Sequence, residues 1–244
     1  MTPADHGRVV AAAALTALLV GGALLGHDEP RELSAAGASP RSPVAATSPT
    51  ATPRTSPSAR PSATERAGWQ GTGSFLVVPG RSGVLGDGPV RRYRVEVERG
   101  LAGDLDRYAA DFAGFVQRTL GDPRGWGHRG RMSFQRVASG DISFTVVLAS
   151  PATTDRLCRP LQTNGIFSCY QGGKAVINVM RWSEGARSYA GHLQEYRQYV
   201  VSHEVGHALG HGHVSSCRGD GRAPTMMQQT KSLQGCARNP WPYP

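Results

Sequence analysis

Apolar and polar residues follow regular patterns over residues 69–244, and these patterns predict the elements of an α/β domain. Residues 93–97 alternate between apolar and charged side chains, which is typical of a strand with one buried face. Apolar side chains between 105 and 120 recur every three or four residues, so they predict an amphipathic helix that ends before Gly121-Asp122-Pro123. A second helix is predicted at 193–209. Further strands are predicted at 75–78, 132–137, 142–148 and 175–180.

Residues 1–68 have a different composition. Residues 9–26 form an uncharged apolar run that is long enough for a signal peptide or a short transmembrane helix. Arg8 precedes this run and acidic residues follow it, which places the N-terminus inside the cell. We therefore predict an uncleaved membrane anchor over 1–27. The alternative is a signal peptide cleaved near the small residues at 36–38.

The next segment, 28–68, is rich in Pro, Ser, Thr and Ala and contains almost no large apolar side chains. Such a segment cannot bury enough surface to offset its ordering entropy, so we predict a disordered stalk. The remaining residues, 69–244, are numerous enough to form a hydrophobic core. We expect them to form one domain at the cell surface, or a secreted domain if the N-terminal segment is cleaved.

The most specific motif lies on the second predicted helix, where residues 203–213 read HEVGHALGHGH and match H-E-x-x-H-x-x-G-x-x-H. Residues four apart share one helix face, so His203 and His207 present two imidazoles to one point. Glu204 lies beside that point, where a carboxylate can reach water without ligating the metal. The spacing predicts one catalytic Zn²⁺ with Glu204 as its general base.

The third metal ligand must come from beyond the helix, because catalytic zinc typically takes three protein ligands. Gly210 can end the helix, since glycine adopts the left-handed conformation at little cost. No glutamate follows Glu204, so the third ligand is His213 or, as the weaker alternative, Asp220. His211 falls on a free position of the pattern, and we expect it to point to solvent.

A second motif, Ala-Pro-Thr-Met-Met-Gln at 223–228, follows the histidines. With this motif the chain resembles the metzincin clan of zinc metallopeptidases, which is named after a methionine-containing turn beneath the zinc. The resemblance implies that Met226 or Met227 supplies a hydrophobic floor under the histidines. More loosely, the region from about residue 68 to the end is similar to a bacterial cell-surface metzincin-like family, most of whose members have no known function.

The resemblance also implies a fold of the α/β (α+β) class, with a twisted mixed sheet, a backing helix, an active-site helix and an irregular C-terminal subdomain. In metzincins an edge strand borders the cleft and pairs with the peptide substrate, and the resemblance gives this role to 175–180. Two positions depart from better-known metzincins. Val214 follows the third histidine, and no tyrosine comes just after the methionines, which puts a tyrosine ligand or oxyanion donor in doubt.

The four cysteines all lie in 69–244. An even number of cysteines in an exported chain predicts two disulfides, for which three pairings exist. We expect the pairs that are nearest in sequence, Cys158–Cys169 and Cys217–Cys236. The alternative, a cysteine-ligated zinc site, lacks any C-x-x-C pair.

The formal net charge of +9 comes almost entirely from arginine. It could favour acidic substrates or an anionic cell envelope. No nucleic-acid-binding motif accompanies the charge, so we interpret it as a solvated surface and expect no nucleic-acid partner. The expected partners are a protein or peptide substrate and, through 1–27, the membrane. We expect a monomer.

Together these patterns predict a zinc-dependent endopeptidase outside the cell. His203, His207 and His213 would hold the metal, and Glu204 would transfer the proton. Two alternatives remain open at this stage. One is a zinc hydrolase that acts on cell-wall peptides or another amide, and the other is a zinc-containing binding domain without catalysis.

Overall fold

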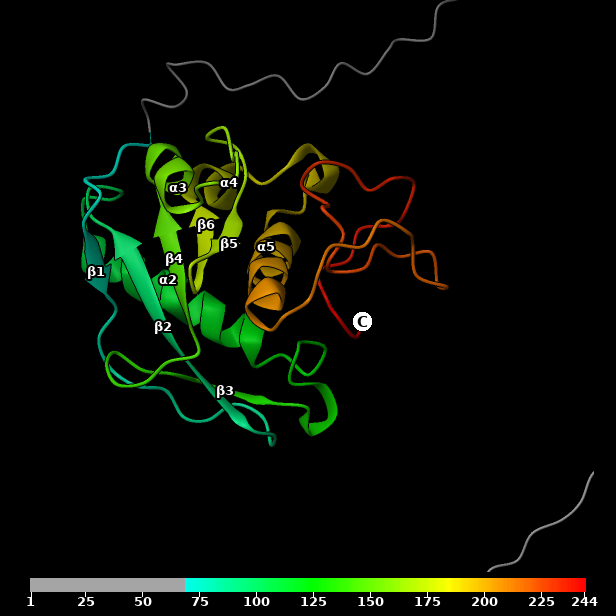
Figure 1. Ribbon diagram of the computed structural model, residues 1–244, viewed down its shortest axis with the longest axis horizontal. Helices are drawn as coiled ribbons and strands as arrows, with labels where there is room; N and C mark the ends of the chain where they lie inside the picture. Colours follow the sequence, from blue (N-terminus) through cyan, green and yellow to red (C-terminus); the bar gives the residue numbers. More distant parts are fainter. Residues whose placement is uncertain (1–68) are drawn as a thin grey trace, which may run out of the picture. The chain divides into compact units, whose positions relative to one another are not determined.

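A six-stranded mixed β-sheet forms the centre of the computed structural model, which describes residues 69–244 (Figure 1). The strand order is β1-β2-β4-β6-β5, and β3 pairs with the first half of β2. Strands β2, β3, β4 and β6 are parallel, whereas β1 and β5 are antiparallel to β2 and β6. The strands are β1 (Phe75–Val77), β2 (Val90–Glu98), β3 (Ser133–Arg136), β4 (Phe144–Ala149), β5 (Cys169–Gln171) and β6 (Lys174–Asn178).

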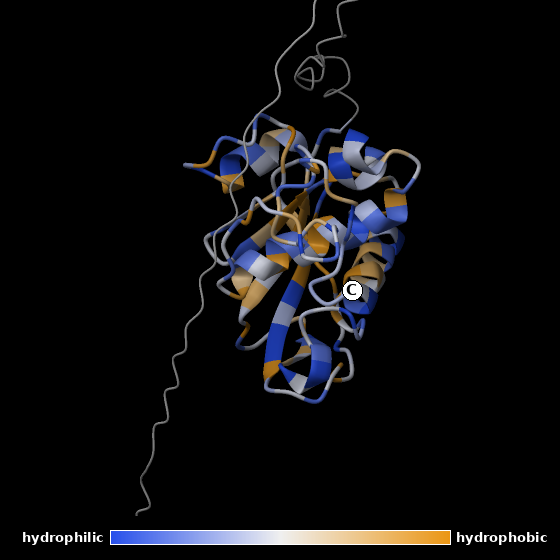
Figure 2. Ribbon diagram, turned by 90° about the vertical axis from the view of Figure 1, so that its right-hand side faces the viewer, coloured by the Kyte–Doolittle hydropathy of each residue, from blue (hydrophilic) through white to orange (hydrophobic). Residues whose placement is uncertain are grey.

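Helices cover the sheet, and alternate strand residues enter two separate cores. The helices are α2 (Leu105–Leu120), α3 (Pro151–Leu157), α4 (Val179–Glu184) and α5 (Leu193–Ala208), with short 3-10 turns at His128–Gly130 and Arg187–Tyr189. Val146 and Ile177 share the larger core with side chains of α2 and α5. Val147 and Val176 point to the other face, where Leu157 of α3 packs. Apolar residues are accordingly concentrated in the central strands (Figure 2).

The two long helices begin and end close to the predicted bounds. The Asp104 side chain caps α2 by accepting a hydrogen bond from the Arg107 amide, and the helix ends at Gly121. Strand β2 is longer than the predicted 93–97, because its first residues pair with β3. The mixed sheet and these helices agree with the expected α/β (α+β) class.

The prediction that 175–180 forms an edge strand at the cleft is wrong. The strand in this region, β6, lies between β4 and β5, and Ala175, Val176 and Ile177 are fully buried. Gly172 and Gly173 both have positive φ angles, which is the geometry of a tight two-residue hairpin, and this turn folds β5 back onto β6 as the new edge. The predicted strand also ends early, because Asn178 caps α4 by accepting from the Met180 amide.

Two disulfides join the pairs that the sequence predicted. Cys158–Cys169 links the end of α3 to β5, and Cys217–Cys236 links the loop after the histidines to the C-terminal segment. Between residues 69 and 244, no helix has both the length and the apolar character needed to cross a membrane. The predicted anchor (1–27) and stalk (28–68) lie outside the described residues.

Candidate metal centre

Helix α5 carries the first part of the motif, including His203, Glu204 and His207, and runs beside β6 and β5, against α2 (Figure 1). Its residues from Tyr199 to Gly206 are all buried, although several of them are polar. The sheet and α2 cover one side of the helix and the C-terminal segment covers another, so most of the surface of this stretch is buried. The apolar periodicity of α5 is weak for that reason.

The end of α5 turns the chain back toward the helix. The His211 amide donates to the Gly206 carbonyl and the Gly210 amide donates to the His207 carbonyl, which is the hydrogen-bond pattern of a Schellman motif. Gly210 occupies the left-handed position with φ of 90°. This turn brings His213 back to the helix.

The three predicted histidine ligands converge. His203, His207 and His213 each offer one nitrogen, and these atoms all lie within 4.8 Å of one another. The Nε2 atoms of His207 and His213 are 3.0 Å apart. Two imidazole nitrogens on one tetrahedral metal ion with bonds of about 2.0–2.1 Å lie roughly 3.3 Å apart, so the spacing of this pair suits a shared metal ion.

Backbone carbonyls orient two of the imidazoles. Nδ1 of His203 lies 2.8 Å from the Thr225 carbonyl, and Nδ1 of His207 lies 2.8 Å from the His211 carbonyl. A carbonyl only accepts hydrogen bonds, so Nδ1 carries a proton in each ring. In the neutral form of such a ring, Nε2 keeps the lone pair that can bind a metal. Such outer contacts are typical of metal-ligating histidines.

Burial sets the protonation of the central groups. It lowers the pKa of His203 to about 3, so this imidazole is neutral, as a metal ligand must be. Burial also lowers the pKa of His213, with the nearby charges of His207 and Lys231 acting in the same direction. Glu204 is 5% exposed, and burial raises its pKa to about 8. A cation in the site would oppose that rise by favouring the carboxylate.

A cavity of about 530 Å³ opens onto the histidines. Its walls come from α5, from β5 with the residues before it, and from the segment after Met227. Edge strand β5 therefore borders the cavity, in the place that the sequence had assigned to 175–180. The lining includes His203, Glu204, His207 and His213 together with Leu161, Phe167, Tyr170, Tyr199, Gln228, Thr230 and Lys231.

A family model described as a protein of unknown function, DUF3152, matches residues 62–244. The chain belongs to the DUF3152 family. No curated protein and no solved structure matches it. The DUF3152 match includes every residue of the metal centre and both disulfides.

Asp220, the alternative third ligand, and His211, at the free position of the motif, take no part in the group of three histidines in the DUF3152 domain. Asp220 accepts from the Arg222 amide and pairs with Arg218, outside the group of histidines. His211 is exposed, as expected, but its ring also stacks on Trp126 with 4.3 Å between ring centroids. The backbone of His211, rather than its side chain, contacts the ligand His207.

The two methionines have different neighbours. Met226 lies against α5, where its sulfur and the Trp126 ring leave no room for a side chain at Gly206. Met227 packs in a separate small cluster with Ala223 and Cys236. Of the two, Met226 is therefore the one that contacts the ligand-bearing turns of α5.

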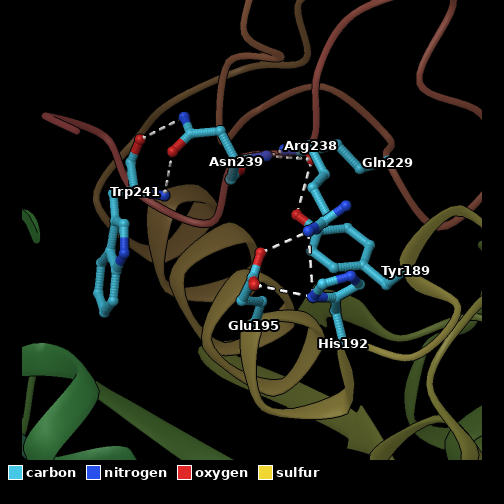
Figure 3. Close-up of polar contacts among 7 residues, drawn as sticks. All are labelled: Tyr189, His192, Glu195, Gln229, Arg238, Asn239 and Trp241. Atoms are coloured by element: carbon cyan, nitrogen blue, oxygen red, sulfur yellow. Dashed lines mark hydrogen bonds and ion pairs between the residues drawn. The ribbon is translucent and has the colours of Figure 1, made fainter.

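Sequence patterns did not reveal the buried residue that organises the C-terminal segment, Gln229. Its amide nitrogen donates to the carbonyls of Pro224 (3.1 Å) and Asn239 (2.7 Å). Its Oε1 accepts from the Tyr189 hydroxyl and the Asn239 amide, at 2.7 and 3.1 Å (Figure 3). A glutamine in an irregular segment carries no periodic signal, so only the fold identifies it.

A second polar group holds the same segment to the start of α5. The Arg238 guanidinium pairs with Glu195 at 2.9 Å, and the same carboxylate lies 3.0 Å from His192 (Figure 3). Nearby, the Asn239 side chain donates a hydrogen bond to the Trp241 carbonyl and accepts one from the Trp241 amide. These contacts fix the C-terminal segment, which also supplies the Thr225 carbonyl behind His203.

Proposed function

We propose that this chain is a zinc-dependent metallopeptidase that hydrolyses peptide bonds outside the cytoplasm. The observation that carries the proposal is the convergence of three imidazole nitrogens within 4.8 Å, beside the buried carboxylate of Glu204 and on the wall of an open cavity. The two disulfides support an oxidising compartment.

The donor set favours zinc with an open coordination position. Imidazole is a preferred zinc ligand, and structural zinc sites usually close with four protein ligands. Within residues 69–244, no fourth His, Cys, Asp or Glu joins His203, His207 and His213. The remaining position would face the cavity, where a substrate could enter.

Bound zinc would polarise the scissile carbonyl and lower the pKa of a water molecule beside it. The Glu204 carboxylate accepts a proton from that water as the water oxygen bonds to the carbonyl carbon. It then delivers the proton to the amine nitrogen as the C–N bond breaks. The Nδ1–H groups of His203 and His207 keep donating to the carbonyls of Thr225 and His211, which would leave the Nε2 atoms for the metal.

The resemblance to metzincins supports the same proposal. Gly210 ends the helix before the third histidine, and Met226 lies against the ligand-bearing helix. Edge strand β5 borders the cavity, so a peptide could add to it as a further strand. An extended peptide would then run past Glu204.

The test compares the wild-type chain with Glu204→Gln on a peptide library that includes cell-wall peptides. We expect zinc-loaded wild type to cleave and a chelator to abolish cleavage. Glu204→Gln should keep one zinc per chain and lose at least about 100-fold in turnover, because a general base contributes that much or more.

The matched control is Asp111→Asn, which makes the same carboxylate-to-amide change at an exposed site on α2 and should cleave like wild type. Full turnover by Glu204→Gln would contradict the proposal. Bound zinc without cleavage of any library member would instead identify a non-catalytic zinc domain.

A further inference from the structure

The cavity contains a cationic side chain that the proposed mechanism does not use. Lys231 lines the cavity together with the histidines, on the wall formed by the C-terminal segment. Its ammonium lies 3.2 Å from the Gln228 side-chain oxygen and 5.2 Å from the centre of the Phe167 ring. A hydrogen bond and a cation–π contact therefore hold the ammonium at the cavity wall.

The charge of Lys231 has no counterion in the structure. Among residues 69–244, Lys231 makes no ion pair, whereas the other lysine, Lys174, pairs with Glu96 at 3.5 Å. Of the described residues that line the cavity, Lys231 is the only Lys or Arg, and the one carboxylate is Glu204 at the reaction centre. The ammonium thus faces a space that a substrate must enter.

The surroundings strengthen an interaction with an anion. Leu161, Phe167 and Tyr170 form an apolar part of the same cavity, and apolar walls lower the local dielectric. Lys231 lines the same cavity as His203, His207 and His213. A group bound by Lys231 would therefore lie in the cavity onto which the proposed reaction centre opens.

We propose that Lys231 is a specificity-determining residue that binds a carboxylate of the substrate beside the scissile bond. This inference rests on the proposed peptidase function and names its substrate class, which is acidic peptides. The carboxylate comes either from an Asp or Glu side chain or from the C-terminus of a short peptide. An ammonium with three donors can bind both.

The experiment measures kcat/KM of the full zinc-loaded chain on matched peptides. One pair differs by Glu against Gln beside the cleaved bond, and both peptides carry an amidated C-terminus. A second pair differs by a free against an amidated C-terminus close to that bond. Wild type should prefer the acidic member of at least one pair by about tenfold, and the pair that responds identifies the source of the carboxylate.

Lys231→Met should abolish this preference, so that the acidic peptide and its neutral partner have about the same kcat/KM. Lys231→Glu should make the neutral peptide the better substrate, and zinc content should be unchanged in both variants. The matched control, Lys174→Met, removes the other lysine and should keep the wild-type preference. Added salt should weaken the preference, because the cavity is open to solvent.

Cleavage by wild type without any preference for the acidic peptides would overturn the inference and leave the proposed function standing. So would a preference that survives in Lys231→Met. If zinc-loaded wild type cleaves none of the peptides, the proposed function fails and the inference fails with it.

Discussion

Hydrogen bonds to backbone carbonyls decide which nitrogen of two candidate metal ligands, His203 and His207, faces the cavity. The carbonyls of Thr225 and His211 each accept from an Nδ1, one on His203 and one on His207. Both carbonyls belong to segments that follow α5 in the chain. The helix places the imidazoles, and the later segments fix their tautomers.

Loss of His213 should abolish tight zinc binding, whereas loss of Asp220 should not. We expect His213→Ala to weaken zinc affinity by at least about 100-fold, because the variant loses a residue that binds the metal directly. Loss of a residue that only hydrogen-bonds to a metal ligand typically costs about 10–100-fold. Competition titration with a chromophoric chelator measures the affinity. Asp220→Ala is the control, since Asp220 pairs with Arg218 in an exposed loop. Equal losses in the two variants would contradict the assignment.

At the scale of elements, α5 is held in place by a segment that precedes it in the chain and by one that follows it. The Trp126 indole donates to the Ser202 carbonyl at 2.9 Å, one residue before the first ligand. The Trp126 ring and the Met226 sulfur meet at Gly206, between the ligand-bearing turns. The approach of these two side chains requires glycine at this helical position.

Gly206→Ala should destabilise the domain, although alanine is the better helix former. The added methyl group would overlap Met226 and Trp126, and overpacking of this kind costs about 1–3 kcal/mol. Urea unfolding of the metal-free chain measures the change in the free energy of unfolding.

The matched control is Gly114→Ala in α2. There the new methyl group would meet only the end of the flexible Arg118 side chain, at 3.3 Å. This variant should gain about 0.5–1 kcal/mol in the free energy of unfolding, from the higher helix propensity of alanine. A similar gain in Gly206→Ala would show that Trp126 and Met226 do not pack as described.

At the scale of the whole molecule, the candidate metal centre lies where the α/β layer meets the irregular C-terminal segment. The segment from 214 to 244 contains no helix or strand, yet Gln229, Asn239 and Cys236 are buried in it. Polar contacts and one disulfide replace regular secondary structure there. The proposed function would depend on this junction, because it supplies the Thr225 carbonyl, Met226 and Lys231.

Removal of the Cys217–Cys236 disulfide should weaken both folding and zinc binding. The cysteines are 19 residues apart, and closing a loop of that size contributes about 3 kcal/mol in the chain-entropy model. We expect the double Cys→Ser variant to lose most of that stability in urea unfolding, and to bind zinc less tightly because the loop holds Thr225.

The comparison is the double Cys→Ser variant at Cys158 and Cys169, which are 11 residues apart and join α3 to β5. It should lose a similar amount of stability while zinc affinity changes less. Equal losses of zinc affinity in the two variants would contradict the role of the Cys217–Cys236 loop in holding Thr225 behind His203.

The sequence by itself determined what depends on neighbours along the chain. The apolar periodicity of 105–120, the glycines that end the two helices and the i, i+4 spacing of His203 and His207 are local properties. They predict α2, the motif-bearing helix α5 and two of the candidate ligands. The pairing of cysteines nearest in sequence is also a short-range property, and both disulfides formed as predicted.

Only the tertiary structure decided what depends on contacts between distant segments. The pattern of a strand shows that it is buried but not which strands flank it. The interior position of β6 and the edge position of β5 were therefore visible only in the tertiary structure. The carbonyl behind His203, the buried Gln229 and the place of Lys231 in the cavity come from an irregular segment without periodicity. Their positions follow from three-dimensional packing, because no local spacing relates them to the helix they contact.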